Sequence, residues 1–138
     1  MRSVRHRLIG ILLTAGLVVL PVPLLAHHGG ASFDVGKELT LKGTVTEWVW
    51  SNPHCFLKFD VKDASGAVAH WVVETQNPTT MTQGGWSRRM FTPGDVVTVT
   101  LQPYKNGAPI GLVRSVILPN GQKLGAGGGG APARPPEP

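Results

Sequence analysis

Histidine and cysteine stand side by side in the middle of the chain, where the sequence reads WVWSNPHCFLKFDV from Trp48 to Val61. Imidazole and thiolate are both ligands of transition metals, so His54 and Cys55 would form half of a metal site if both pointed to the same side. Neighbouring side chains of a strand point to opposite faces, however. The two can therefore bind one ion only where the strand bulges.

The strand pattern separates the roles of the two residues. Cys55 has the parity of Leu57 and Phe59, which predicts a buried thiol, and as the only cysteine it cannot form an internal disulfide. His54 follows the turn Asn52–Pro53 and is expected to point away from the core. Two interpretations of His54 stay open: it lines the rim of a binding face, or it hydrogen-bonds backbone groups and fixes the turn.

The first 26 residues have the features of an export signal. Three arginines precede the apolar run Leu8–Leu20, and PVPLLA leads to a cleavage site after Ala26. The apolar run is shorter than the roughly 20 residues that span a bilayer. We therefore expect a Sec-type signal peptide over residues 1–26 and a periplasmic or secreted bacterial protein without a stable membrane anchor. An uncleaved anchor is the alternative.

Cleavage after Ala26 would make His27 the first and His28 the second residue of the mature chain. The α-amine and ring of an N-terminal histidine form a chelate, and further imidazoles complete a copper or zinc site. His54 would be the distant partner if the arm of residues 27–38 folds back over the domain. The alternative is an arm with two solvated histidines.

The charge of the chain gives no sign of nucleic-acid binding. There are 13 Lys and Arg against 8 Asp and Glu, and three of the arginines lie in the expected signal. The mature chain would thus carry 10 basic and 8 acidic side chains, a net charge of +2. No basic stripe remains. The expected partner is a small ligand or another periplasmic protein.

Residues 39–124 are rich in strand-forming side chains. Alternation and β-branched residues predict five strands, which are Leu39–Trp50, Cys55–Val61, Ala67–Thr75, Val96–Tyr104 and Ile110–Pro119. The stretch Asn77–Asp95 between the third and fourth strands contains two prolines and a glycine pair, so we expect a short helix from Pro78 or an irregular crossover. Residues 125–138 are dominated by Gly, Pro and Ala and are predicted to be disordered.

The turn between the second and third strands fixes their register. A three-residue loop, Ala64–Gly66, pairs Asp63 with Ala67, and such a loop needs a left-handed residue in its third place, where Gly66 stands. This register predicts two inner and two outer cross-strand pairs: Phe59 with Trp71, Leu57 with Val73, Asp60 with His70, and Phe56 with Glu74.

Three strands, a crossover and two strands predict an all-β domain with a small α content. In a domain of this size we expect a five-stranded Greek-key barrel of the OB type over residues 39–124. A β-sandwich is the competitor, but it usually needs seven strands. OB barrels serve many unrelated functions, so the fold alone does not give one.

Four stretches carry a resemblance to a known family. They are AHH with the following Phe33–Asp34, LKGTVTEWVWSNPH, GGWSRR and PGDVVTVT. With them the chain from Ala26 to Leu124 resembles the domain-of-unknown-function family 6152, a set of short exported bacterial proteins. The resemblance implies an extracytoplasmic compartment and a small barrel, and it supplies no activity. Members tend to carry basic residues just before the Gly-Trp, whereas this chain carries Arg88 and Arg89 after it.

The tryptophans supply candidates for ligand binding. Trp48, Trp50 and Trp86 are more than a small core needs, so one or two can lie at the surface and stack on a sugar, a quinone or a partner's side chain. Core packing is the alternative for each. Arg88 and Arg89 can receive an anion or remain solvated.

No catalytic constellation is visible in the sequence. There is no Gly-x-Ser-x-Gly, no His-Glu-x-x-His and no phosphate-binding glycine loop before a helix. Leu41, Val45 and Val49 share one parity in the first strand, and Glu47 interrupts that face. A bulge, a barrel-end position or a polar pocket would explain Glu47. Nothing pairs a nucleophile with a base, so we expect no enzyme.

The sequence thus predicts an exported β-barrel that acts as a binding or accessory module. The arm, the turn SNPH and the segment around Trp86 are expected to form its site. The candidate ligand-binding residues are Trp50, Asn52, His54, Trp86 and Arg88. The alternative is a protein that binds copper or another transition metal such as zinc, through His27, His28 and His54.

Overall fold

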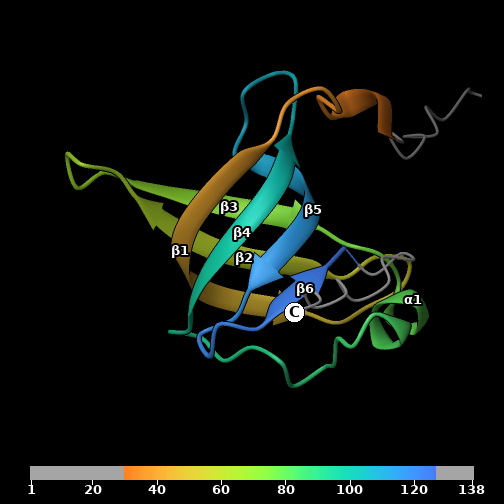
Figure 1. Cartoon of the computed structure of the whole chain (residues 1–138). Coiled ribbons are helices and arrows are strands. Elements are labelled where there is room, and N and C mark those ends of the chain that lie inside the picture. Colours follow the sequence, from red (N-terminus) through yellow and green to blue (C-terminus); the bar gives the residue numbers. More distant parts are fainter. Residues whose placement is uncertain (1–29, 127–138) are drawn as a thin grey trace, which may run out of the picture.

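A computed structural model describes residues 30–126 (Figure 1). The expected signal peptide, His27, His28 and residues 127–138 lie outside this range. Its strands are β1 (Leu39–Val49), β2 (Phe56–Lys62), β3 (Val68–Glu74), β4 (Val96–Pro103), β5 (Ile110–Ile117) and β6 (Lys123–Gly125). Its helices are the 3₁₀ turn η1 (Gly30–Ser32) and α1 (Pro78–Gln83).

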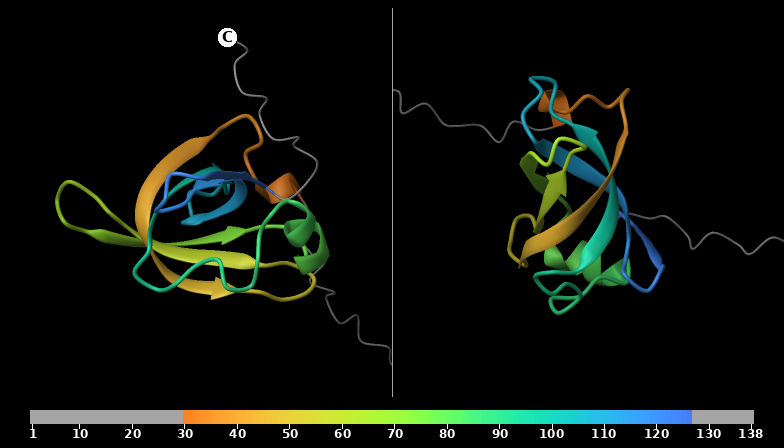
Figure 2. Two further views of the ribbon diagram at one scale, coloured as in Figure 1. Left: turned by 60° about the horizontal axis from the view of Figure 1, so that its bottom comes forward. Right: turned by 90° about the vertical axis from the view of Figure 1, so that its left-hand side faces the viewer.

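Five of the strands close into a barrel. The sheet order is β3-β2-β1-β4-β5-β6, and a parallel pairing of β3 with β5 closes the ring. The other pairings are antiparallel, and β6 pairs with β5 outside the ring (Figure 2). This topology confirms the predicted OB-type barrel with a short helix between its third and fourth strands.

β1 pairs with two neighbouring strands, β4 and β2, because it curves along its length (Figure 2). Its first half pairs with β4 and its second half with β2. At Gly43 a Cβ atom would lie only 2.5 Å from the carbonyl oxygen of Asp60 and 2.7 Å from a ring carbon of Phe59. Only glycine therefore allows β1 to approach β2 this closely.

A bulge between Val45 and Glu47 rotates the end of β1. Before the bulge, Val45 is buried in the core. After it, Glu47 faces outward, and its carboxylate lies 2.6 Å from Nζ of Lys58. The bulge is one of the explanations expected for Glu47. It also shows that the predicted shared face of Val45 and Val49 is wrong, because Val49 lies on the outer side and Trp48 turns inward.

β2 and β3 pair in the predicted register. Asp60 lies opposite His70 and Phe56 opposite Glu74, and the inner pairs match as well. Gly66 has a φ of 88°, as its place in the loop requires. All four predicted cross-strand pairs are therefore confirmed.

The barrel interior is apolar, and the predicted burial of Cys55 is confirmed. The buried core includes Val45, Cys55, Leu57, Phe59, Val73, Met81, Trp86, Phe91, Val97, Val99, Leu101, Val113, Val116 and Leu124. Trp71, expected in the core, is only half-buried. The reason is that β5 pairs with β3 over Val72–Glu74 alone, so the earlier part of β3 has no neighbour on that edge.

α1 begins where the sequence predicts a helix. Asn77 is the N-cap, and its side chain accepts a hydrogen bond of 3.0 Å from the backbone N–H of Thr80. Pro78 occupies the first helical position. The buried side chain of Met81 holds the helix against the core. No helix in residues 30–126 is long and apolar enough to cross a membrane.

The described part of the N-terminal arm is attached to the barrel. Phe33 is buried and packs edge-on against Tyr104, with their ring centres 4.7 Å apart. Further along, the side-chain amide of Gln102 donates a 3.1 Å hydrogen bond to the carbonyl oxygen of Val35. The arm therefore runs along the end of β4 and over the outer side of that strand.

Candidate functional site

His54 lies at the rim of the barrel, between β1 and β2. Its side chain is 35% exposed, and that of Glu74 is 27% exposed. Nδ1 of His54 lies 3.0 Å from the carbonyl oxygen of Thr75 and 3.1 Å from Oε1 of Glu74. Both neighbours are acceptors, so Nδ1 is assigned as the protonated nitrogen. In the neutral ring, Nε2 is then left with a free lone pair.

The loop that carries His54 is held at several points. The hydroxyl of Ser51 donates a 2.9 Å hydrogen bond to the carbonyl oxygen of His54, and Asn52–Pro53 is a cis peptide. The backbone N–H of Cys55 donates to Gln76, and that of Thr75 donates to Cys55. His54 therefore hydrogen-bonds a backbone carbonyl group, as one of the two interpretations expects. The other interpretation, that it lines the rim of a binding face, stays a prediction.

Half-buried apolar side chains surround the His54–Glu74 pair on the outer side of the barrel. The pairings place Val49 beside Phe56, Phe56 beside Glu74, and Glu74 beside Leu112. A second row joins Val72 to Ile110. We call this surface the β2–β3 face, defined by Val49, Phe56, Val72, Ile110, Leu112, His54 and Glu74, and all seven side chains are half-buried.

The outward position of these side chains is unusual for a solvated sheet. The outer side of an antiparallel sheet normally carries polar residues, because water covers it. Figure 2 shows α1 at one end of the barrel, where it does not lie over the outer surface of β2 and β3. A patch of apolar side chains on the outer side of a sheet is a candidate interaction surface.

Two further side-chain pairs flank the β2–β3 face. Glu47 pairs with Lys58 at 2.6 Å, and Asp60 pairs with Nδ1 of His70 at 2.7 Å. The latter is the surface pair that the hairpin register predicts. Three carboxylates at or beside the face, those of Glu47, Asp60 and Glu74, therefore each have a basic partner.

Cys55 contributes no chemistry to this face. It is 0% exposed and points into the core, opposite to His54. Burial raises the pKa of its thiol, and the hydrogen bond to Ser51, the neighbouring Thr75 and the charge of Arg88 oppose that rise only in part. A buried thiol with a raised pKa is a poor nucleophile and metal ligand.

The predicted tryptophans pack together and do not all face solvent. Trp86 is 1% exposed, and its Nε1 donates a 2.8 Å hydrogen bond to the carbonyl oxygen of Gly125. Trp48 stands between Trp86 and Trp50, with ring centres 5.8 Å and 5.6 Å away. The structure therefore gives Trp86 a core position without ring surface for a ligand. Trp50 is half-buried at the edge of this cluster.

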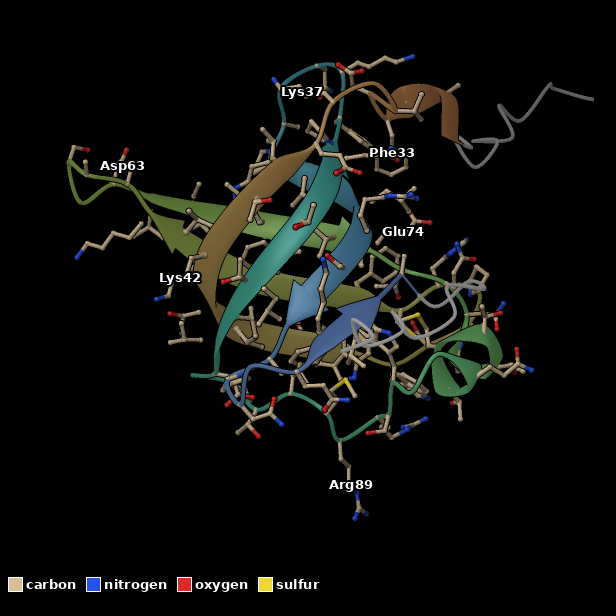
Figure 3. The ribbon with its side chains drawn as sticks, in the orientation of Figure 1. Phe33, Lys37, Lys42, Asp63, Glu74 and Arg89 are labelled. Atoms are coloured by element: carbon tan, nitrogen blue, oxygen red, sulfur yellow. The ribbon has the colours of Figure 1, made fainter. Side chains whose placement is uncertain are left out.

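The remaining predicted residues are exposed. Asn52 lies in the loop next to His54, and Arg88 follows Trp86 in the segment between α1 and β4. Arg89 points away from the barrel (Figure 3). The structure thus places Asn52 and His54 in the same loop. Trp86 is not at the surface with them but buried in the core.

A metal site cannot be assembled from the described residues alone. Within residues 30–126 no group of three or more His, Cys, Asp or Glu side chains is placed to hold an ion. His27 and His28 lie outside the described residues, so the structure does not place them. Of the three predicted metal ligands, it positions His54.

Part of the β2–β3 face escapes prediction from the sequence. The hairpin register already places Glu74 beside Phe56, which is a usable signal. Ile110 and Leu112 reach the face through the parallel pairing of β3 with β5, and no short motif indicates this pairing. Val49 joins it because of the bulge in β1.

A family model matches the greater part of the chain. It is the model of the family of unknown function DUF6152, and it covers residues 15–114. The match agrees with the resemblance seen in the sequence motifs. No curated protein matches the chain.

Proposed function

The chain belongs to the family of unknown function DUF6152, and from this premise we propose that it is an exported, non-enzymatic binding module. Its binding surface is the β2–β3 face. The ligand is a small molecule with an apolar ring and a hydrogen-bonding group. The ring packs on Phe56 and Leu112, and the polar group meets His54.

One observation carries the proposal. Apolar side chains of four strands converge around a single His54–Glu74 pair on the outer side of the barrel. OB-type barrels use this same region, the outer face of strands 2 and 3 with the adjoining loops, to bind their ligands. The loop with Asn52 and His54 is the first of those adjoining loops.

The local chemistry favours binding over catalysis. Cys55 and His54 point to opposite sides of the strand, so they cannot act as a nucleophile and its base. Nδ1 of His54 is engaged by Glu74 and Thr75, which fixes the ring in one orientation. A fixed ring with a free acceptor nitrogen is well suited to receive a hydrogen bond from a ligand.

Export is supported by the sequence before the described residues. The arginine-rich start, the apolar run and PVPLLA form the three parts of a signal peptide. Export can be tested by fractionating bacterial cells that express the full chain. The expected product is a periplasmic protein that starts at His27, and removal of residues 2–26 should retain the protein in the cytoplasm.

The binding face can be tested with a soluble aromatic alcohol. 2-Naphthol is a suitable probe because it combines an apolar ring system with a hydroxyl group that can donate a hydrogen bond to Nε2 of His54. In a ¹⁵N–¹H spectrum of the mature protein, it should shift amide signals of the loop 50–55 and of β3 more than those of β4. Phe56→Ala should weaken these shifts.

Ile117→Ala is the matched control, because Ile117 is an exposed apolar side chain on the outer surface of β5, away from the β2–β3 face. It should leave the 2-naphthol shifts unchanged. Equal shifts over all outer strands, or equal weakening by both variants, would reject the β2–β3 face as the binding surface.

A further inference from the structure

An open groove crosses the outer surface of β1, β4 and β5. It has a volume of about 270 Å³, and it is lined by Lys42, Val96, Thr98, Ile117, Leu118 and Pro119. We call it the β4–β5 groove. Figure 3 shows Lys42 and Glu74 at opposite sides of the barrel, so the groove is separate from the β2–β3 face.

The strand pairings place two lysines at the ends of one row across this groove. Lys42 of β1 pairs with Thr98 of β4, and Thr98 pairs with Ile117 of β5. Ile117 pairs in turn with Lys123 of β6. Because neighbouring strands lie about 4.8 Å apart, the row from Lys42 to Lys123 is about 14 Å long.

The apolar side chains of the groove are unusually exposed. Of the four large apolar side chains that are exposed in residues 30–126, two line it: Val96 at 47% and Ile117 at 38%. They stand in neighbouring rows of the sheet, on either side of the half-buried Thr98. Exposed apolar side chains that gather in one place mark an interaction site.

The groove carries positive charge that no carboxylate of its lining neutralises. Asp95 precedes Val96 in the sequence, but its side chain accepts a 2.8 Å hydrogen bond from the backbone N–H of Thr92. In the part of the chain that the structure describes, neither Lys42 nor Lys123 forms an ion pair. Both ammonium groups can therefore receive an anion without displacing a carboxylate.

A cation beside exposed apolar surface is complementary to an anionic amphiphile. The ammonium group of Lys42 attracts a negative head group as a point charge, and the hydroxyl of Thr98 can donate a hydrogen bond to it. An alkyl chain over Val96 and Ile117 removes apolar surface from water. The groove is slightly smaller than the usual small-molecule pocket of about 300 to 1,000 Å³, which favours a short chain.

We propose that the β4–β5 groove binds a short alkyl carboxylate. The carboxylate lies between Lys42 and Thr98, and the chain covers Val96 and Ile117. This site is independent of the β2–β3 face, so the failure of one leaves the other standing.

Sodium octanoate is the probe, and it is titrated into the purified mature protein while ¹⁵N–¹H spectra are recorded. The amide signals of Val96, Thr98 and Ile117 should shift, and those of the loop 50–55 should stay in place. Hexanoate should bind at least fourfold more weakly, because each buried methylene contributes to binding. Acetate, which has the charge without the chain, should cause no shifts at the same concentrations.

Lysine variants test the recognition of the charge. Lys42→Gln should lower the octanoate affinity about threefold, as loss of an exposed ion pair does, and Lys42→Arg should retain it. Lys58→Gln is the matched control, because Lys58 is also an outward-facing lysine of the sheet but pairs with Glu47 at 2.6 Å. It should leave octanoate binding unchanged.

Two apolar variants test the position of the chain. Ile117→Ala should weaken octanoate binding about threefold, because it removes part of the apolar surface that the chain covers. Phe56→Ala should not affect it, because Phe56 lies on the β2–β3 face. The two variants thus exchange the roles that they have in the 2-naphthol experiment. The unshifted signals of each variant show whether its fold is intact.

Four results would overturn the proposed site. Octylammonium could bind as tightly as octanoate, or Lys58→Gln could weaken binding as much as Lys42→Gln. The octanoate shifts could be centred on the loop 50–55. Finally, the signals of Val96 and Ile117 could move on dilution of the protein without octanoate, which would make the groove a contact between two copies of the chain.

Discussion

The outer surface carries two histidine–carboxylate pairs of the same chemistry in different surroundings. His54 with Glu74 is half-buried among apolar side chains, and Thr75 also holds its Nδ1. His70 with Asp60 is closer, at 2.7 Å, but the His70 side chain is 79% exposed. In Figure 3, Glu74 lies on the side of Phe33, whereas Asp63 marks the far tip of the hairpin that carries His70.

The comparison shows that distance alone does not identify a site. An exposed ion pair contributes little, because water screens the charges and both side chains lose freedom on pairing. A fixed imidazole beside apolar surface retains one free nitrogen in a defined direction. The apolar surroundings of His54, rather than its pairing with a carboxylate, make it the candidate for function. The exposed His70 is the residue to compare it with.

The largest expected effect concerns Cys55, which points to the opposite side of the strand from His54. Cys55 must point inward for His54 to point outward. Because burial raises the pKa of the Cys55 thiol, little thiolate forms near neutral pH, and modification should require opening of the fold. We expect a thiol reagent such as DTNB to react more than about 100-fold more slowly with the native than with the urea-unfolded protein.

The sign of the pH dependence follows from the direction of that shift. The folded state keeps the thiol protonated at pH values where the unfolded chain already ionises. Stability linked to this group is present below the ordinary thiol pKa and is lost as the pH rises through the raised value in the folded protein. Rapid native-state modification at neutral pH would mean that Cys55 is exposed, and the assigned faces of β2 would then be wrong.

Gly43→Ala should disturb the strands beneath both pairs. The added Cβ would stand 2.5 Å from the backbone of Asp60, which cannot move aside as a side chain can. Overpacking of this kind costs about 3 kcal/mol in free energy of unfolding, measurable by urea denaturation. Gly125→Ala is the control because open space surrounds that position, and it should be nearly neutral. Equal stability of the two variants would refute the close approach of β1 to β2.

Alanine substitution of each histidine compares the pairs directly. His54→Ala removes a half-buried hydrogen bond to Thr75 and should cost about 1 kcal/mol. His70→Ala removes an exposed pair and should cost less than about 0.5 kcal/mol. Urea denaturation of both variants measures the difference. A larger loss for His70 would reverse the ranking of the two sites.

Much of this arrangement follows from residues close together in the sequence. The parity of Cys55, the three-residue loop ending at Gly66 and the cap before Pro78 are short-range signals, and each predicts its local structure. The hairpin register even places Glu74 beside Phe56. Local rules work here because turn geometry and side-chain alternation act over a few residues.

Other parts depend on contacts that no local pattern contains. Trp86 can be buried because its Nε1 donates a hydrogen bond to the carbonyl oxygen of Gly125 in β6, which is far away in the sequence. Val49 moves outward because β1 bulges, and a single extra residue reverses the face. Leu112 joins the face through the parallel pairing of β3 with β5. The sequence therefore predicts only some of the residues that form the β2–β3 face.

The smallest expected effect is the response of the pairs to salt. The coupling between His70 and Asp60, of about 0.5 kcal/mol in a double-mutant cycle, should fade as salt rises to 1 M. The coupling between His54 and Glu74 should fade less, because both side chains are half-buried. Equal salt dependence would mean that both pairs are equally solvated.

The central claim is that His54 holds its proton on Nδ1 and presents Nε2 to the surface. A long-range ¹⁵N–¹H spectrum of the imidazoles, recorded well above the ordinary histidine pKa of about 6.5, reports the tautomer of each ring. We expect the Nδ1–H form for His54. An Nε2–H form would contradict it, because the nitrogen assigned to the ligand would then carry the proton.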